Sequence, residues 1–239
     1  MHRSDPLAYL QTLLSKDFEA AKYAASRKRQ QSREPLVITL SRDYGALGED
    51  IATRLSECLD IPMYDAEILE LIAKHAKTDK FYYQHHDEQG GASVSTFLYS
   101  LVSGTTATLQ NYRRHLYDVV LDLARRDCLI VGRGAHLILR GKKVFRVRVV
   151  GTHEVCAERI AHALQIPLKE AQQKVAEIND KRHQSILNIF GDERFSLGHA
   201  TNFDLVINTD HIPADGAMPV ILLALQQTGF DLQTRDQTA

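Results

Sequence analysis

The residues best suited to chemistry lie where an apolar run gives way to a glycine-bearing turn. Residues 36–40 are apolar or β-branched, and the polar segment 41–50 leads from them into a helical pattern. A strand that feeds a glycine turn and a helix N-terminus forms an anion site, because unpaired helix N–H groups and the positive end of the helix dipole point at the turn. Gly45 and Gly48 let the backbone approach an anion closely. The segment therefore predicts a phosphate-binding loop.

This loop departs from the phosphate-loop pattern G-x-x-x-x-G-K-[ST] at functional positions. Glu49 stands at the position of the lysine, Asp43 stands at that of the first glycine, and no hydroxyl directly follows Glu49. In the pattern, the lysine reaches the β- and γ-phosphates and the hydroxyl holds Mg²⁺. Another cation is therefore needed beside the loop, and Arg42 is the candidate that lies nearest in the sequence.

Further basic residues follow the other predicted strands or lie in the segments after them. They are Arg133, Arg159, Lys181, Arg182 and Arg194. Guanidinium groups bind phosphates bidentately and spread positive charge over a transferring phosphoryl group. Any single arginine is more often an exposed surface residue, but the coincidence of several with strand ends favours a phosphoryl-transfer site.

The elements that position these residues alternate between strand and helix about five times. Apolar or β-branched runs predict strands at 36–40 and around 127–131, and largely apolar segments predict strands at 203–208 and at 144–150, where Arg146 and Arg148 lie on one side of a partly alternating pattern. A shorter candidate lies at 63–65. Helical spacing fills the intervals, and the polar residues 179–183 separate a helix at 168–178 from a short one that ends near residue 190. Such alternation is typical of a parallel sheet covered on both faces, with ligands beyond the carboxyl ends of its strands. We expect an α/β, three-layer protein with a mostly parallel five-stranded sheet and an N-terminal helical extension.

Asp65 has two compatible interpretations. It lies where a helical pattern begins, so it is a candidate helix N-cap. It also lies at the end of the short candidate strand, so its carboxylate is a candidate to face a ligand at the same edge of the sheet.

The connection at 77–111 concentrates aromatic, histidine, glycine and hydroxyl residues. A connection of this length inside a compact domain is usually functional or mobile, and we expect a segment that covers the substrate. His85, His86 and Asp87 lie within it, but no further ligands stand at a metal-binding spacing, so no metal site is predicted there.

The first 34 residues predict an N-terminal helix and a basic linker, and residues 35–239 predict the core. Leu7, Leu10, Leu14 and Phe18 form an apolar stripe at helical spacing, and a basic run closed by Pro35 follows. The run offers a contact for nucleic acid, but a short charged run is usually a solvated linker, so nucleic acid is not the favoured partner.

Composition restricts the classes of protein that remain. The chain of 239 residues is 44% apolar and 25% charged, with a net charge of −1, so no overall field favours nucleic acid or an anionic membrane. Its three cysteines, Cys58, Cys128 and Cys156, are scattered in apolar stretches, which predicts reduced thiols in a core and a cytoplasmic protein. No apolar run reaches the length of a signal peptide or a membrane span.

Several of these segments resemble the cytidylate kinase-like family of P-loop nucleoside-monophosphate kinases. The matching segments, which extend over roughly residues 36–225, are 38–42 with 45–51, the pair Tyr64-Asp65, residues 130–135, Asp180-Lys181-Arg182, and residues 203–209. Each motif alone is of weak to moderate specificity, but their common order is more specific. The resemblance implies transfer of the γ-phosphoryl group of ATP, with Mg²⁺, onto a small acceptor, namely a nucleoside monophosphate.

The resemblance also implies roles for individual residues. The loop around the donor phosphates comprises Ser41, Arg42, Asp43, Tyr44, Gly45, Ala46, Leu47, Gly48, Glu49 and Asp50. Arg159 is similar to an arginine that stacks on adenine, Asp65 and Arg133 lie on the acceptor side, and residues 77–111 occupy the acceptor-binding insertion. Asp180, Lys181 and Arg182 belong to a lid at 179–200 that closes on the phosphates. Arg42, Arg133 and Arg182 are then the catalytic cations.

Two other functions stay open at this point. The absent lysine motivates a nucleotide-binding module without kinase activity, which acts as a sensor or binds a partner protein. The basic linker motivates a protein that binds RNA or DNA. A homodimer is also left open by the sequence.

Overall fold

The computed structural model describes residues 34–78, 106–191, 193–230 and 232. The predicted helix at 6–25, the basic residues after it, and the His85, His86 and Asp87 cluster all lie outside these ranges. Most of the predicted covering segment at 77–111 lies outside them as well.

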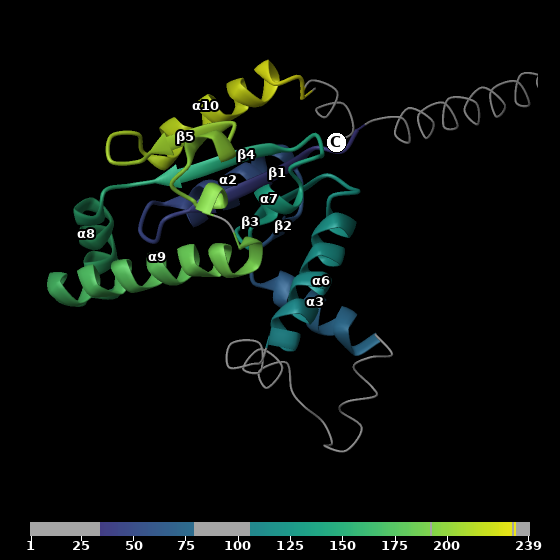
Figure 1. Ribbon diagram of the computed structural model, residues 1–239. Coiled ribbons are helices and arrows are strands. Elements are labelled where there is room, and N and C mark those ends of the chain that lie inside the picture. The colour runs from purple at the N-terminus through teal and green to yellow at the C-terminus, as the bar shows by residue number, and fades with distance from the viewer. Residues whose placement is uncertain (1–33, 79–105, 192, 231, 233–239) are drawn as a thin grey trace, which may run out of the picture. The chain divides into compact units, whose positions relative to one another are not determined.

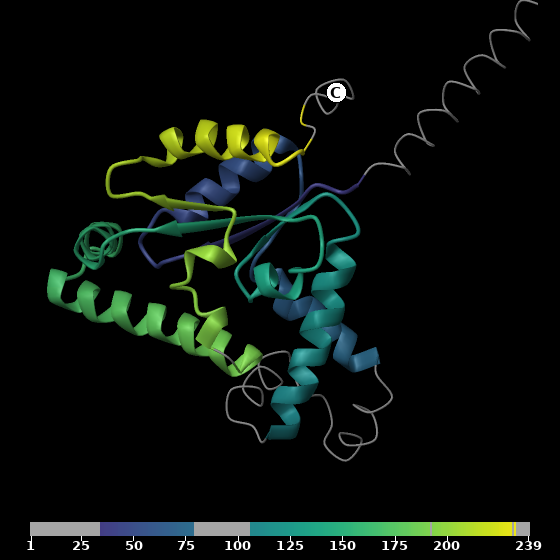
Figure 2. The same ribbon diagram turned by 45° about the horizontal axis from the view of Figure 1, so that its top comes forward.

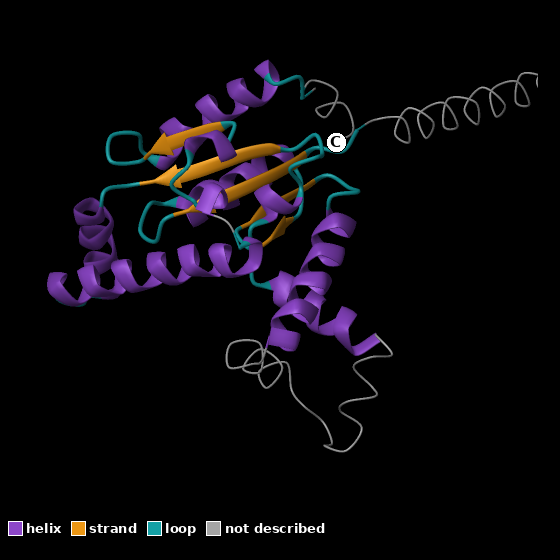
Figure 3. Ribbon diagram, in the orientation of Figure 1, coloured by secondary structure: helices purple, strands orange, loops and turns teal. Residues whose placement is uncertain are grey.

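A five-stranded sheet forms the centre of the described core (Figures 1 and 3). The strands are β1 (Val37–Arg42), β2 (Met63–Tyr64), β3 (Cys128–Val131), β4 (Phe145–Val150) and β5 (Leu205–Asn208). They lie in the order β2-β3-β1-β4-β5, and every neighbouring pair is parallel. The predicted α/β class with a largely parallel five-stranded sheet is therefore confirmed.

Helices cover both faces of this sheet. They are α2 (Gly48–Leu59), α3 (Glu67–Thr78), α6 (Thr106–Leu123), α7 (Ala135–Ile138), α8 (His153–Leu164), α9 (Leu168–Phe190) and α10 (Ala214–Gln227), with short 3-10 turns η1 (Glu193–Phe195) and η2 (Ala200–Asn202). One apolar core joins the sheet to α2, α8 and α10, and a second joins it to α3, α6 and α7. Figures 1 and 2 agree that α10 and α9 lie on opposite sides of the sheet. None of the helices in the described ranges is long and apolar enough to cross a membrane.

The middle strand β1 shows why the sheet is buried on both faces. Ile38 and Leu40 belong to the first core, whereas Val37 belongs to the second, and all three are almost completely buried. Successive side chains of a strand point to opposite faces, so an uninterrupted apolar run fits a strand covered on both sides.

The region of residues 168–190 differs from the sequence-based prediction. It is one continuous helix of 23 residues, α9, and the predicted break at 179–183 is wrong. Those residues are polar but include no glycine or proline, so nothing in them interrupts the helical hydrogen bonds. The helix begins after Pro167 and ends at Gly191, whose φ of +70° is a left-handed helix end.

The cysteines confirm the prediction of core thiols only in part. Cys128 and Cys156 are buried, and burial raises the pKa of Cys128 to about 12 and that of Cys156 to about 11, so both stay protonated thiols. Cys58 is exposed in the last turn of α2, which corrects the expectation that all three are packed in the core. The buried side chains of α2 end at Leu55, before Cys58 is reached.

A polar cluster is buried between the sheet and α7. Ser41 on β1 is paired in register with Arg148 on β4, and both side chains are almost inaccessible to solvent. Ser41 Oγ lies 3.3 Å from His136 Nδ1 on α7, and the His136 ring stacks on Phe203 with ring centroids 4.8 Å apart. Burial, and then the charges of Arg148 and Arg146, lower the pKa of His136 to about 3. His136 is therefore a neutral core residue at ordinary pH.

This burial predicts a specific dependence of stability on pH. The unfolded chain takes up a proton on His136 near its ordinary pKa, whereas the folded chain resists protonation until about pH 3. The stability is therefore complete above the ordinary pKa and falls as pH decreases, by up to about 2 kcal/mol between about pH 7 and pH 5. Urea unfolding across this range should show a shallower pH slope for His136→Gln than for the wild type. His162→Gln, at an exposed position, is the control, and equal slopes for wild type and His136→Gln would contradict the assignment.

Candidate functional site

The loop between β1 and α2 has the backbone of an anion-binding turn. Gly45 has a φ of +86°, and a Cβ there would lie 2.6 Å from the carbonyl oxygen of Cys156, so no other residue fits without displacement. Leu47 also has a positive φ, of 60°, which is unfavourable for a residue with a side chain and is typical of functional sites. The N–H of Ile51 bonds to the carbonyl of Leu47 at 3.0 Å, so the N–H groups of residues 48–50 precede the first intrahelical bond. They are suited to an anion.

Side chains from distant parts of the chain hold this loop in place. The Asp43 N–H bonds to the carbonyl of Val149 on β4 at 3.0 Å, and the Asp43 carboxylate pairs with the buried Arg148. Arg159 on α8 donates to the carbonyl of Gly45 at 3.3 Å and to the side chain and carbonyl of Thr209 at 3.0 and 2.6 Å. The loop is thereby fixed to the sheet on the side of β4 and β5.

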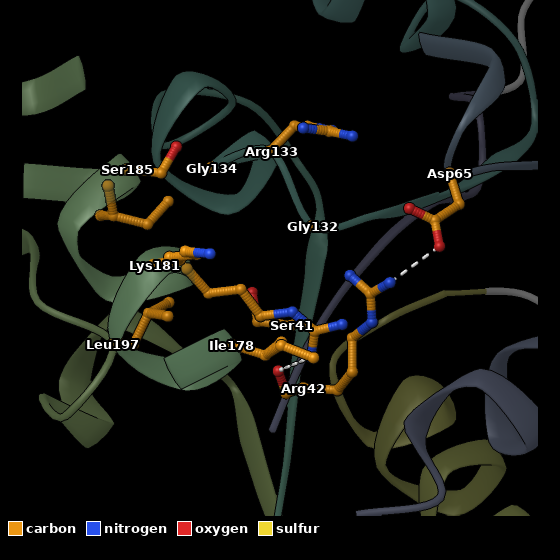
Figure 4. Close-up of a pocket in the computed structure, with 12 residues that line it drawn as sticks. Ser41, Arg42, Asp65, Gly132, Arg133, Gly134, Ile178, Lys181, Ser185 and Leu197 are labelled. Atoms are coloured by element: carbon orange, nitrogen blue, oxygen red, sulfur yellow. Dashed lines mark hydrogen bonds and ion pairs between the residues drawn. The ribbon is translucent and has the colours of Figure 1, made fainter. Parts of the chain in front are cut away.

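A cavity of about 330 Å³ lies at the carboxyl ends of β1 and β3 (Figure 4). It is lined by Ser41, Arg42, Asp65, Gly132, Arg133, Gly134, Ile178, Lys181, Arg182, Ser185, Ile186 and Leu197. Its walls thus combine four cationic side chains with three aliphatic ones, which suits an anionic ligand that also carries a less polar part.

Arg42 is held by two carboxylates at this cavity. Its Nε donates to Glu49 Oε1 at 2.9 Å, and its Nη2 donates to Asp65 Oδ2 at 2.8 Å, the ion pair drawn in Figure 4. The side chain of Arg42 is only 11% exposed, so both pairs are better shielded from water than ordinary surface salt bridges. Asp65 therefore directs its carboxylate toward the cavity. Its main-chain carbonyl, rather than its side chain, accepts the N–H of Ile68 at 3.4 Å.

Arg133 reaches the cavity from an unusual turn after β3. Gly132, Arg133 and Gly134 have successive φ values of 75°, 55° and 69°, and a Cβ on Gly134 would lie 2.6 Å from the Phe190 ring. The left-handed conformation of Arg133 stores strain that the surrounding packing has to offset. Burial raises the pKa of Tyr112 on α6, and the positive charge of Arg133 acts in the opposite direction. Helix α6 thus contributes a phenol beside this arginine.

Helix α9 closes the cavity and contacts the loop directly. Arg182 donates through Nη1 to the carbonyl of Arg42 at 3.1 Å and through Nη2 to Glu49 Oε1 at 3.3 Å. Its guanidinium lies over the Tyr44 ring, 5.9 Å from the centroid, and Asn179 Oδ1 accepts the Tyr44 N–H at 2.8 Å. The middle of α9 is therefore docked on the phosphate-loop candidate.

The structure brings six of the residues that the sequence singled out together at this cavity. Those that line the cavity are Ser41, Arg42, Asp65, Arg133, Lys181 and Arg182. Glu49 adjoins them through its ion pairs with Arg42 and Arg182.

The remaining predicted residues do not line this cavity. Ala46 is fully buried, Asp50 pairs with Arg54 on its own helix, and Asp180 is exposed on α9. The guanidinium of Arg159 is occupied by the loop and Thr209, so its predicted contact with a base stays a prediction.

Several residues at the site were not singled out by the sequence. Ile178, Ser185 and Ile186 line the cavity, and Asn179 and Tyr112 contact its loop or its arginine. The spacing of residues in α9 could have predicted some of these contacts. Residues 178, 181, 182 and 185 are spaced by three and four, so a continuous helix places them on one face.

Several solved structures, including the following three, are similar to this chain. An uncharacterized protein from Eubacterium ventriosum is 18% identical, and the match covers 82% of this chain and 99% of that one with a TM-score of 0.61. A shikimate kinase from Bacteroides thetaiotaomicron is 14% identical, with 80% and 96% covered and a TM-score of 0.43. A gluconokinase from Sinorhizobium meliloti is 14% identical, with 87% and 99% covered and a TM-score of 0.44. No curated protein matches the chain.

The family comparison is more specific than these likenesses in fold. The model of the cytidylate kinase-like family matches residues 37–211, which include the loop after β1, the Arg133 turn and α9. All five strands of the sheet and all residues that line the cavity lie within the matched range, and the chain belongs to the cytidylate kinase-like family.

Proposed function

We propose that this protein transfers the γ-phosphoryl group of ATP to a small acceptor, a nucleoside monophosphate. The observation that carries the proposal is the convergence of Arg42, Arg133, Lys181 and Arg182 on one cavity beside the loop. Phosphoryl transfer needs little covalent work from the protein, because catalysis consists of positioning and of neutralising charge on the transferring group. A cavity with this composition can do both.

The donor triphosphate binds to the loop at residues 43–50 in this proposal. The N–H groups at the start of α2 and the positive φ of Gly45 suit an anion held by backbone donors. Arg159 is fixed to Thr209 behind the loop and supports the adenine side from there.

Mg²⁺ accompanies the nucleotide, and the residues present fit that arrangement. Mg²⁺ in such sites is held by one or two carboxylates together with substrate phosphates and water. Asp65 at the cavity would supply one carboxylate, whereas Asp50 pairs with Arg54 and does not line the cavity, and no cluster of three or more metal-ligating side chains occurs in the described ranges. The ion would neutralise phosphate charge when it is bound.

The acceptor occupies the cavity between β3 and α9. Arg133 binds its phosphate, Asp65 and Lys181 bind polar groups around it, and Ile178 and Ile186 provide an apolar wall. Asp180 on the same helix is exposed, so in this proposal it belongs to the lid segment at 179–200 but does not bind the acceptor in the cavity.

A second candidate is a nucleotide-binding module without kinase activity. The observation that favours it is the carboxylate of Glu49 at the lysine position, where it pairs with two of the cavity's arginines. These pairs reduce the positive charge that is available to a phosphate.

One assay separates the two candidates. The full-length protein with MgATP is offered a panel of nucleoside monophosphates, and release of ADP is followed by enzyme coupling. We expect ADP release above the level without acceptor for at least one monophosphate. ATP binding without turnover on any of them would instead favour the inactive module.

Arg133→Ala should separate acceptor binding from donor binding. A hydrogen-bonded charge contact is worth about 1.5–3 kcal/mol, so kcat/KM for the acceptor should fall about 10- to 100-fold while ATP affinity changes little. Arg42→Ala should show the reverse, with the greater loss in ATP affinity or in kcat. Arg125→Ala, whose side chain is 79% exposed, is the control. Equal losses of acceptor and ATP affinity in Arg133→Ala would remove Arg133 from the acceptor side.

A further inference from the structure

Glu49 occupies the position at which an ordinary phosphate loop carries its lysine, and its side chain has specific partners. It is the second residue of α2, directly after the loop. One carboxylate oxygen, Oε1, accepts both Arg42 Nε at 2.9 Å and Arg182 Nη2 at 3.3 Å. These two guanidinium groups come from the end of β1 and from the middle of α9, which are 140 residues apart in the sequence.

The carboxylate leaves much of each guanidinium available. A guanidinium has five N–H donors. Arg42 uses two nitrogens for Glu49 and Asp65, and Arg182 uses two for Glu49 and the carbonyl of Arg42. Both arginines line the cavity while they are paired with Glu49, so the pairing holds them at the site without removing them from it.

The two arginines would not stay together without a counter-charge. Burial and the neighbouring charge of Arg42 lower the pKa of Arg182, whereas Glu49 acts in the opposite direction. The two guanidinium groups repel each other because both are positively charged, and the carboxylate that they share offsets that repulsion.

We propose that Glu49 is a positioning residue that gathers Arg42 and Arg182 into a two-guanidinium clamp for the terminal phosphate of a nucleoside triphosphate, and that it fastens α9 to the loop. The inference rests on the proposed function for the identity of the ligand. In this arrangement the cation at the lysine position is replaced by an anion that holds two cations, one from the end of β1 and one from α9. The clamp contacts the γ-phosphate, whereas the loop N–H groups contact the phosphates shared by ATP and ADP.

The first test needs no ligand. Hydrogen exchange of the full-length protein is compared for wild type, Glu49→Gln and Glu57→Gln. Glu57 is an exposed carboxylate on the same helix α2 and is the matched control. We expect faster exchange in the loop at 43–47 and in the middle of α9 for Glu49→Gln only, because the charged contact to Arg182 is lost. Unchanged exchange in both segments would overturn the proposal.

The second test compares ATP with ADP by calorimetric titration of the same proteins. We expect Glu49→Gln to lower ATP affinity about tenfold or more while ADP affinity changes little, since hydrogen bonds to charged groups are the stronger ones. Glu49→Lys restores the lysine of the ordinary pattern but repels both arginines, so it should bind ATP less tightly than wild type. Equal loss of ATP and ADP affinity, or ATP binding by Glu49→Lys at least as tight as wild type, would overturn the clamp.

The two tests also separate this inference from the proposed function. Wild-type protein that binds neither ATP nor ADP would contradict the proposed function and the phosphate clamp, while faster exchange in Glu49→Gln would still support the fastening of α9 by Glu49. Wild-type protein that binds ATP, together with a Glu49→Gln variant that binds ATP and exchanges like wild type, would contradict only the role of Glu49.

Discussion

The pairing of β1 on both of its edges is the constraint on which the rest of the structure depends. β3 pairs along one edge and β4 along the other, and both pairs are parallel. The carboxyl ends of the three strands therefore meet at one edge of the sheet, so the loop after β1 and the Arg133 turn after β3 lie beside each other. A shift of β1 by one residue would move Ile38 and Leu40 from the first apolar core into the second and Val37 in the opposite direction, so both cores would have to repack.

The second constraint is electrostatic. Arg42, Arg133 and Arg182 share one cavity, and cations at such proximity require anions or a bound anionic ligand. Glu49 and Asp65 supply part of that charge through their ion pairs with Arg42, whose side chain is largely buried. The chain thus holds several guanidinium groups at the end of β1 in the absence of a loop lysine. The contacts of Arg182 with Glu49 and with the carbonyl of Arg42 link α9 to the loop.

Short sequence patterns predicted the strands and the glycine turn, because these features depend mainly on neighbouring residues in the chain. The strand around 36–40 is a continuous apolar or β-branched run, the strand at 144–150 is apolar except for Arg146 and Arg148, and the turn after β1 follows from its glycines and from the helix after it. The break predicted in α9 was wrong because polar residues alone do not interrupt a helix. The helix begins after Pro167 and ends at Gly191. The pairs Asp43–Arg148 and Tyr44–Asn179 could not be predicted, since their partners lie over 100 residues apart and only the sheet order brings them together. From the sequence, Glu49 was recognised only as the residue that replaces the lysine of the pattern. Its two arginine partners could not be predicted, because one of them lies in α9.

The most direct test of this account is a crystal structure of the full-length protein with Mg²⁺ and a non-hydrolysable ATP analogue. We expect the β-phosphate on the N–H groups of the loop at 43–50 and the terminal phosphate between the guanidinium groups of Arg42 and Arg182. We also expect Glu49 to keep its contact with both arginines. A triphosphate bound away from the loop, or a terminal phosphate that contacts neither arginine, would contradict this account.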